Sequence, residues 1–128
     1  MHCPYCRIDP DLRVRFRNDL AFFIADPRYQ GALEHSGVIV PVEHRPTVFD
    51  LTEPEILATF RLLTLVRAWM DEQFRPQGYN IGWNSGAVAG QHVFHAHLHV
   101  IPRFADEPLA GQGIRSHLKS DANRRSTI

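Results

Sequence analysis

Residues 91–103 read Gln-His-Val-Phe-His-Ala-His-Leu-His-Val-Ile-Pro-Arg, and this stretch decides the fold prediction. Three of its histidines alternate with apolar residues, which is typical of a β-strand that packs on one face and is free for chemistry on the other. Proline cannot donate a backbone hydrogen bond, so Pro102 is expected to end the strand. The alternation places one set of side chains on the free face, His95, His97 and His99, and another on the packed face, Ala96, Leu98 and Val100.

Three imidazoles on one strand face allow several interpretations. A solvated, histidine-rich edge would explain one such residue better than three in strict alternation. A single metal held by all three rings is disfavoured, because the Cα atoms of His95 and His99 would lie about 13 Å apart on an ideal strand and each ligand nitrogen must lie within about 2.1 Å of the metal. A neutral imidazole with one nitrogen held as a donor can attack with the other. His97, at the centre of the row, is therefore the candidate nucleophile.

The stretch from 95 to 101 resembles the His-φ-His-φ-His-φ-φ signature of the histidine triad proteins at every position. The resemblance extends upstream through residues 84–86 and 90–91 and covers the chain from Cys3 to about Arg103. It implies a homodimer in which the two sheets join. It also implies a nucleotide as the small-molecule substrate.

The same resemblance implies a hydrolase in which His97 attacks the α-phosphorus of a nucleotide, and water then cleaves the nucleotidyl-histidine intermediate. The backbone carbonyl near His95 would hold the ring N–H of His97. The related uridylyltransferases have glutamine at the third triad position, so His99 favours a hydrolase. Diadenosine polyphosphates, nucleoside phosphoramidates and adenylylated amines all fit as substrates. A nucleotide-binding module with little turnover is the alternative from another functional class.

The loop before the triad has the composition of a phosphate-binding loop. Glycines and small side chains let backbone N–H groups approach an anion closely, and side-chain amides can donate to phosphate oxygens. A plain hairpin loop would look similar, but the position directly before three histidines favours phosphate binding. Many family members have Ser or Thr where His92 stands. The predicted phosphate contacts are His99, Asn84, Gly90, Gln91 and His92.

Length and composition indicate one domain, residues 1–128, with enough apolar content for a core. Lys plus Arg and Asp plus Glu number 14 each, which gives no reason to expect nucleic-acid or membrane binding. The sequence shows no long apolar run and no signal-peptide pattern. We therefore expect a soluble cytoplasmic protein.

The Cys3-Pro4-Tyr5-Cys6 motif suits either a zinc half-site or a thiol redox centre, with an inert pair as the bland interpretation. In a redox protein the motif would open a helix, whereas here Asp9-Pro10 follows directly, which favours a turn. The resemblance to zinc-bearing histidine triad proteins implies two further zinc ligands. By this resemblance His44 and His95 join Cys3 and Cys6, and residues 1–10 form the segment that binds one structural zinc per chain.

Short apolar runs predict strands over 12–18, 20–25, 37–42 and 79–83. A capping box that starts at Thr52 predicts a helix to about Phe74, so the fold should be α+β, an antiparallel sheet of about five strands with this helix on one face. Residues 104–128 read as a solvated tail. Asp26 matches a ribose-binding carboxylate of the family and equally suits a turn before proline. The helix residues expected in the core are Ile56, Phe60, Leu63, Val66 or Arg67, Met70 and Phe74.

Overall fold

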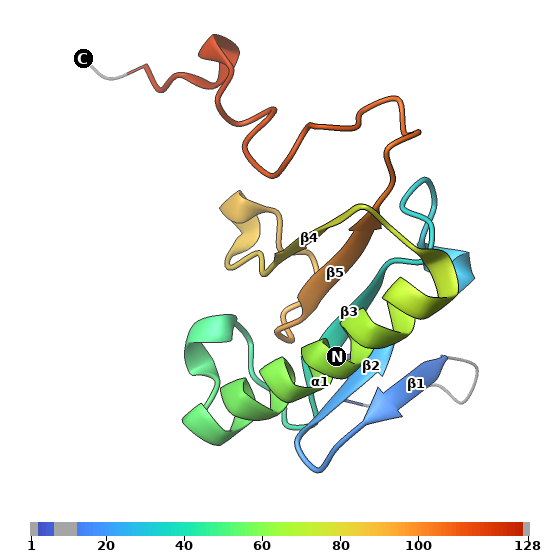
Figure 1. Cartoon of the computed structure of the whole chain (residues 1–128). Coiled ribbons are helices and arrows are strands. Elements are labelled where there is room, and N and C mark those ends of the chain that lie inside the picture. The colour runs from blue at the N-terminus through green and yellow to red at the C-terminus, as the bar shows by residue number, and fades with distance from the viewer. Residues whose placement is uncertain (1–2, 7–12, 127–128) are drawn as a thin grey trace.

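The computed structural model describes residues 3–6 and 13–126. One long helix packs on a five-stranded antiparallel sheet with the strand order β1-β2-β3-β5-β4 (Figure 1). This confirms the expected α+β fold. The strands are β1 Val14–Arg17, β2 Ala21–Ile24, β3 Gly37–Pro41, β4 Gly78–Gly82 and β5 Leu98–Arg103. The helices are α1 Glu53–Phe74 and four short 3-10 turns, η1 Pro27–Tyr29, η2 Val48–Asp50, η3 Ala87–Ala89 and η4 Asp121–Asn123.

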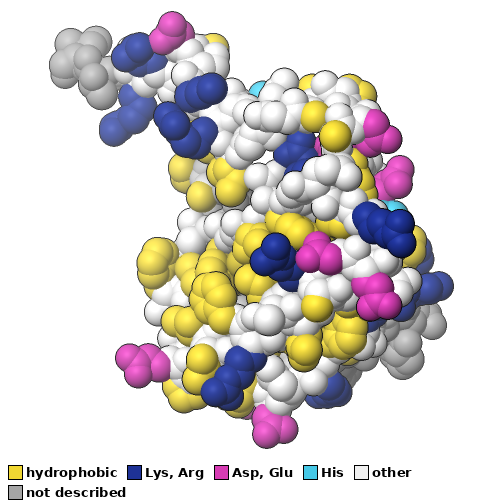
Figure 2. All heavy atoms as spheres, in the orientation of Figure 1, with side chains coloured by type: hydrophobic (Ala, Val, Ile, Leu, Met, Phe, Trp, Pro, Cys, Tyr) yellow, Lys and Arg dark blue, Asp and Glu magenta, His cyan; other side chains and the backbone are white. Residues whose placement is uncertain are grey.

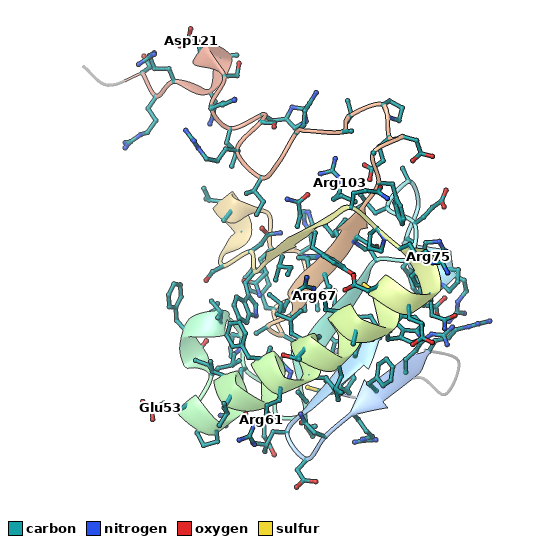
Figure 3. All side chains as sticks on the ribbon, in the orientation of Figure 1. Glu53, Arg61, Arg67, Arg75, Arg103 and Asp121 are labelled. Carbon is teal, nitrogen blue, oxygen red and sulfur yellow. The ribbon has the colours of Figure 1, made fainter. Side chains whose placement is uncertain are left out.

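Helix α1 begins at the predicted capping box. The Thr52 hydroxyl accepts from the backbone N–H of Glu55, and the Glu55 carboxylate accepts from the backbone N–H of Thr52. The helix ends at Phe74 and is capped by Arg75, which has a left-handed backbone (φ 54°) and donates its N–H to the Met70 carbonyl. Arg61 and Arg67 lie on its exposed side (Figure 3). No helix in the described part of the chain has the length and apolar content needed to cross a membrane.

The face of α1 that meets the sheet differs from the expected one. Ile56 and Phe60 are 36% and 48% exposed, so their predicted place in the core is wrong. The small side chains of Ala58 and Thr59 are buried instead, and the Thr59 hydroxyl donates to the Glu55 carbonyl at 2.8 Å. The buried cluster between helix and sheet consists of Ala21, Phe23, Ala25, Ile39, Leu62, Val66, Met70, Leu98 and Val100.

Strand β5 begins at Leu98, later than the alternation predicted, and residues 91–97 are irregular. The strand continues through Pro102, which pairs with Tyr79 of β4, so the prediction that Pro102 ends it is wrong. Strand β3 pairs with β5 only as far as Val100. Pro102 therefore has a strand neighbour on one side only, and its missing N–H leaves no β3 carbonyl without a donor.

The sheet face opposite α1 carries the N-terminal segment. Phe22, Ile24 and Val40 are buried there, and Tyr5 and Val38 pack against them. Of the predicted zinc-binding segment 1–10, residues 3–6 are described; the Asp9-Pro10 turn and the start of the strand predicted from residue 12 lie outside the described residues. Because side chains alternate between sheet faces, His99 of β5 also lies on this face.

Residues 104–126 lead away from the sheet in a series of turns (Figure 1). The Arg103 guanidinium fixes their start by donating to the Asn80 side chain at 2.6 Å and to the carbonyls of Gln112 and Leu109 at 2.7 and 3.1 Å. Lys and Arg side chains gather towards the far end of the segment (Figure 2).

The close packing around Gly37, the first residue of β3, predicts that a larger residue at this position lowers stability. A Cβ atom added to Gly37 would overlap the backbone carbonyl oxygen of Ile24 and lie 2.6 Å from the Phe23 ring. We expect Gly37→Ala to lower the free energy of unfolding by about 1–3 kcal/mol, because a well-packed strand cannot shift cheaply. Urea unfolding followed by circular dichroism measures the change. Gly78→Ala is the matched control, since no atom lies within 4 Å of its added Cβ; equal stability of the two variants would contradict the argument.

Candidate active site and metal centre

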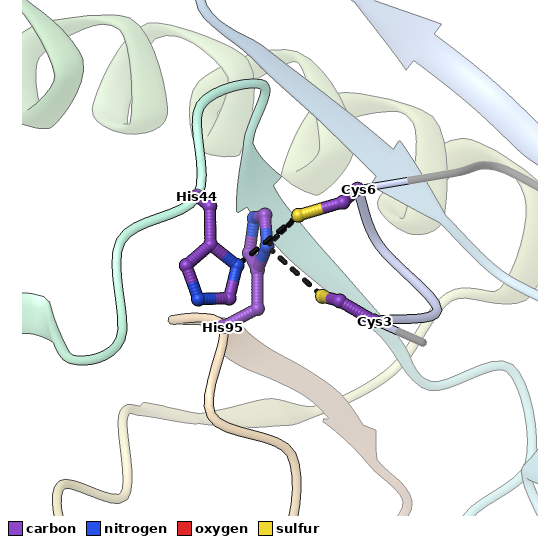
Figure 4. Close-up of side chains that lie close together, drawn as sticks. All are labelled: Cys3, Cys6, His44 and His95. Carbon is purple, nitrogen blue, oxygen red and sulfur yellow. Dashed lines mark hydrogen bonds between the residues drawn. The ribbon is translucent and has the colours of Figure 1, made fainter. Parts of the chain in front are cut away.

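The four predicted zinc ligands meet although they come from three distant segments of the chain (Figure 4). The ligand atoms of Cys3, Cys6, His44 and His95 all lie within 4.8 Å of one another. The Cys6 sulfur lies 3.1 Å from Nδ1 of His44, and the Cys3 sulfur lies 3.4 Å from Nδ1 of His95. A tetrahedral metal with two sulfur and two nitrogen ligands requires edges of roughly 3.5 Å. The set therefore fits one metal ion.

The orientation of the His95 ring suits ligation. Its Nε2 lies 2.8 Å from the Pro41 carbonyl, which accepts the ring proton and leaves the Nδ1 lone pair for a metal. The ring is completely buried, and burial lowers the pKa of His95. The neutral form, which is the one that binds a metal, is therefore favoured.

Cys6 lacks the lowered pKa of a redox-active thiol. Desolvation of its sulfur raises the pKa of Cys6, and the neighbouring Cys3 raises it further. Reactive thiols require the opposite shift. The geometry favours metal binding over the redox interpretation of the motif.

Tyr5 connects the cysteine motif with the triad. Its ring centroid lies 5.7 Å from that of His95 and 5.6 Å from that of His97. Burial raises the pKa of Tyr5, so its hydroxyl stays protonated at neutral pH. Sequence reasoning missed this residue. The available signal was its position between Cys3 and Cys6, because a residue between two ligands must lie close to the metal cluster and to the histidines beside it.

His97 is held in a single tautomer. Its Nδ1 donates to the backbone carbonyl of His95 at 2.9 Å, which leaves the Nε2 lone pair available. The His99 ring lies 4.9 Å from it, centroid to centroid. Burial lowers the pKa of His99, and the adjacent His97 lowers it further, so the neutral ring is favoured. The pair combines a candidate nucleophile with a candidate hydrogen-bonding group.

Both rings open into a cavity of about 510 Å³ on the sheet face opposite α1. This volume is sufficient for a nucleotide-sized ligand. Its walls are mainly apolar, with one carboxylate. The lining residues are Pro4, Tyr5, Ile24, Asp26, Tyr29, Gln30, Leu33, Ser36, Gly37, Val38, His97, His99 and Ile101.

Asp26 has the turn role that the sequence predicted, while its ribose contact stays a prediction. It caps η1 as the turn-initiating residue, and it lines the cavity. Its two oxygens accept from the Arg28 side chain, at distances down to 2.7 Å. The hydrogen bonds from Arg28 lower the pKa of Asp26 and outweigh its burial, so the carboxylate is ionised at neutral pH.

The loop before the triad is shaped by Gln91. Its buried amide donates to the carbonyls of Pro46 and Val93 at 2.6 and 3.0 Å, and its oxygen accepts from the N–H of Gly86 at 2.9 Å. Both amide hydrogens are thus used within the protein. The cavity lining does not include Asn84, Gly90, Gln91 or His92, so the phosphate contacts predicted for these residues stay predictions.

The model of the HIT domain matches residues 11–106. The chain belongs to the HIT family. It is 30% identical to an adenylylsulfatase from Arabidopsis thaliana over 126 residues, which cover 93% of this chain and 62% of the relative. It is 36% identical to a bis(5'-adenosyl)-triphosphatase from Saccharomyces cerevisiae over 85 residues, 60% of this chain and 41% of the relative. The chain thus spans less than two thirds of the length of these HIT relatives.

Solved HIT structures have the same fold. A HIT family protein from Bacillus anthracis superposes with a TM-score of 0.73 at 26% identity, over 81% of this chain and 74% of that one. A HIT family member from Bacillus subtilis gives 0.72 at 25% identity, over 83% and 76%. These structures contain the same arrangement of one long helix on a five-stranded antiparallel sheet.

Proposed function

We propose that this HIT protein is a nucleotide hydrolase that cleaves at the α-phosphate through a nucleotidyl-His97 intermediate. The observation that carries the proposal is the hydrogen bond from Nδ1 of His97, a residue that lines a nucleotide-sized cavity, to the His95 carbonyl. This bond holds the proton on one nitrogen and leaves the other as a nucleophile.

In the first step, Nε2 of His97 forms a bond to the α-phosphorus while the bond from phosphorus to the leaving group breaks, and the leaving group departs with the electron pair. In the second step, a water oxygen bonds to phosphorus and the N–P bond breaks, which regenerates the neutral imidazole. The attacking water releases one proton to solvent, which balances the proton that the leaving group takes up. Neutral His99 and the predicted loop contacts Asn84, Gly90 and His92 would hold the phosphate oxygens, with Gln91 keeping the loop in shape.

The cavity suggests the substrate class. Ile24, Val38 and Ile101 offer apolar walls to a nucleobase, and the ionised Asp26 can accept from ribose hydroxyls. The names of the two relatives, an adenylylsulfatase and a bis(5'-adenosyl)-triphosphatase, support an adenosine nucleotide. Diadenosine polyphosphates, nucleoside phosphoramidates and adenylyl sulfate are therefore the substrates to assay.

Removal of the nucleophile should abolish turnover. We expect His97→Asn to lower kcat by several powers of ten, well beyond the roughly 10²- to 10³-fold cost of one lost stabilising hydrogen bond, while the affinity for AMP stays within a few-fold. Steady-state assays on the three substrates and calorimetric titration with AMP measure the two effects. A single-turnover reaction with labelled substrate should leave label on the wild-type protein. The quench must be alkaline, because phosphoramidate bonds are acid-labile.

Two results would count against covalent catalysis. One is a His97→Asn variant that retains a tenth of the wild-type rate. The other is product formation without protein-bound label, which would indicate direct attack by water. A wild-type protein that binds AMP but hydrolyses none of the substrates would instead be a nucleotide-binding module.

We also propose that the metal is zinc and that it is structural. Two thiolates and two imidazoles suit tetrahedral zinc, and four protein ligands leave no open position for substrate.

We also propose a cytoplasmic location, because a reducing compartment keeps a pair of cysteines free. A fluorescent fusion found outside the cytoplasm would contradict that location.

Zinc binding should contribute to folding. We expect about one zinc per chain, and we expect Cys3→Ser or His44→Ala to lose the metal and several degrees of melting temperature, because the set is assembled only in the folded chain. Turnover should fall modestly. Elemental analysis and thermal unfolding measure these effects, with His117→Ala, an exposed histidine in the tail, as the control. Metal-free protein of unchanged stability, or chelation that stops catalysis at once without loosening the fold, would refute the structural role.

We further propose a homodimer that joins the β4 edges of two sheets. The exposed side of α1 and strand β4 form an apolar groove that includes Phe60, Leu63, Tyr79 and Ile81. Sedimentation should give about twice the chain mass of 14.7 kDa. Phe60→Asp should shift it towards the monomer, because a buried charge opposes association. The control is Phe49→Asp, at an exposed residue outside the groove; a monomeric wild type would exclude the proposal.

A further inference from the structure

The peptide group between His95 and Ala96 is held from both sides. Its carbonyl accepts the Nδ1 proton of His97 at 2.9 Å, and its N–H donates to the backbone carbonyl of Arg45 at 2.6 Å. A peptide group is planar, so fixing the direction of its N–H also fixes the direction of its carbonyl. The position of the Arg45 backbone therefore determines where the His97 ring finds its acceptor.

The Arg45 side chain ties this backbone to the first turn of α1. Its Nε donates to both carboxylate oxygens of Glu55, at 3.0 and 3.1 Å. Glu55 is 3% exposed and also accepts from the backbone N–H of Thr52 at 2.8 Å. Burial by itself would raise the pKa of Glu55, but the donors from Thr52 and Arg45 outweigh it, so the carboxylate is ionised. The Arg45 side chain is 33% exposed, but its partner carboxylate is buried, so separating the pair would leave the Glu55 charge uncompensated.

We propose that the Arg45–Glu55 ion pair is a positioning element for the nucleophile His97. The proposal rests on the proposed nucleotidyl-histidine chemistry. Neither residue lines the cavity, and the side chain of each is engaged by the other. The pair acts through the Arg45 carbonyl and the 95–96 peptide, which set the angle at which His97 meets the phosphorus. Small errors in such an angle are costly, since a displacement of about 1 Å can reduce a rate by about 10²-fold.

Kinetics with diadenosine triphosphate separate positioning from substrate binding. Arg45→Met should lower kcat by about 10- to 100-fold, the usual cost of losing a group that orients a functional residue, with KM and the affinity for AMP within about twofold of wild type. Arg45→Lys keeps the charge and should recover part of the loss. The Arg45→Met/Glu55→Leu double variant should be no slower than Arg45→Met, because the two residues act as a unit.

Thr52→Ala is the matched control for stability. It removes the other half of the same capping box and should lower the melting temperature, but it leaves the ion pair and should leave kcat unchanged. If Thr52→Ala loses as much kcat as Arg45→Met, the pair serves stability only and the proposal is overturned. The positioning role is also excluded if Arg45→Met loses zinc and regains its full rate when zinc is added.

A second measurement does not depend on turnover. Nitrogen-15 NMR of the His97 ring at pH 7 should show one tautomer with the proton on Nδ1 in the wild type and in Thr52→Ala. In Arg45→Met the two ring nitrogens should move towards averaged shifts. If no substrate is hydrolysed by the wild type, the proposed function fails, while this spectrum still tests the positioning role. An Arg45→Met variant with the wild-type His97 spectrum would overturn it.

Discussion

Residues 91–97 lie outside the sheet, directly before β5, so their buried polar groups must find partners outside a β-ladder. Backbone carbonyls provide them: Pro46 accepts from Gln91, Pro41 from the His95 ring and Arg45 from the Ala96 N–H. Among the described residues, no buried side-chain nitrogen or oxygen lacks a partner. Carbonyls at the end of β3 and in the segment after it therefore hold the segment before β5, and these contacts fix the geometry of His95 and His97.

The candidate metal cluster and the proposed nucleophile share one residue. The His95 ring belongs to the metal set, while the His95 carbonyl holds the His97 proton. Tyr5 provides a second connection, because it lies between two ligands and forms part of the cavity wall. A metal held by all four residues would have no open position for a substrate, yet its binding would order both the cavity wall and the backbone behind the proposed nucleophile. The metal cluster can therefore support the geometry of His97 without contributing to the reaction itself.

Local patterns predicted most of the fold. Strands β1 to β4 lie within the predicted runs or one residue beyond them, and the capping box at Thr52 starts α1 as expected, because alternation and caps are encoded by neighbouring residues. The family signature led to the metal cluster. Local patterns failed where distant segments decide: the small residues Ala58 and Thr59 face the sheet in place of Phe60. The Arg45–Glu55 pair joins positions whose pairing no local periodicity reveals.

The alternation of the histidines suggested a strand with all three rings on one face, but the structure gives the three rings different surroundings. Regular strand geometry begins only at Leu98, so His95 is released from the alternation and both of its ring nitrogens are used, one by the Pro41 carbonyl and one towards the cysteine sulfurs. His97 uses one nitrogen, and the His99 ring makes no hydrogen bond within the described residues. The three rings thus differ in how many nitrogens they can offer a ligand. The point at which β5 begins, more than the sequence pattern, places the His95 ring among the cysteines and leaves the His97 and His99 rings facing the cavity.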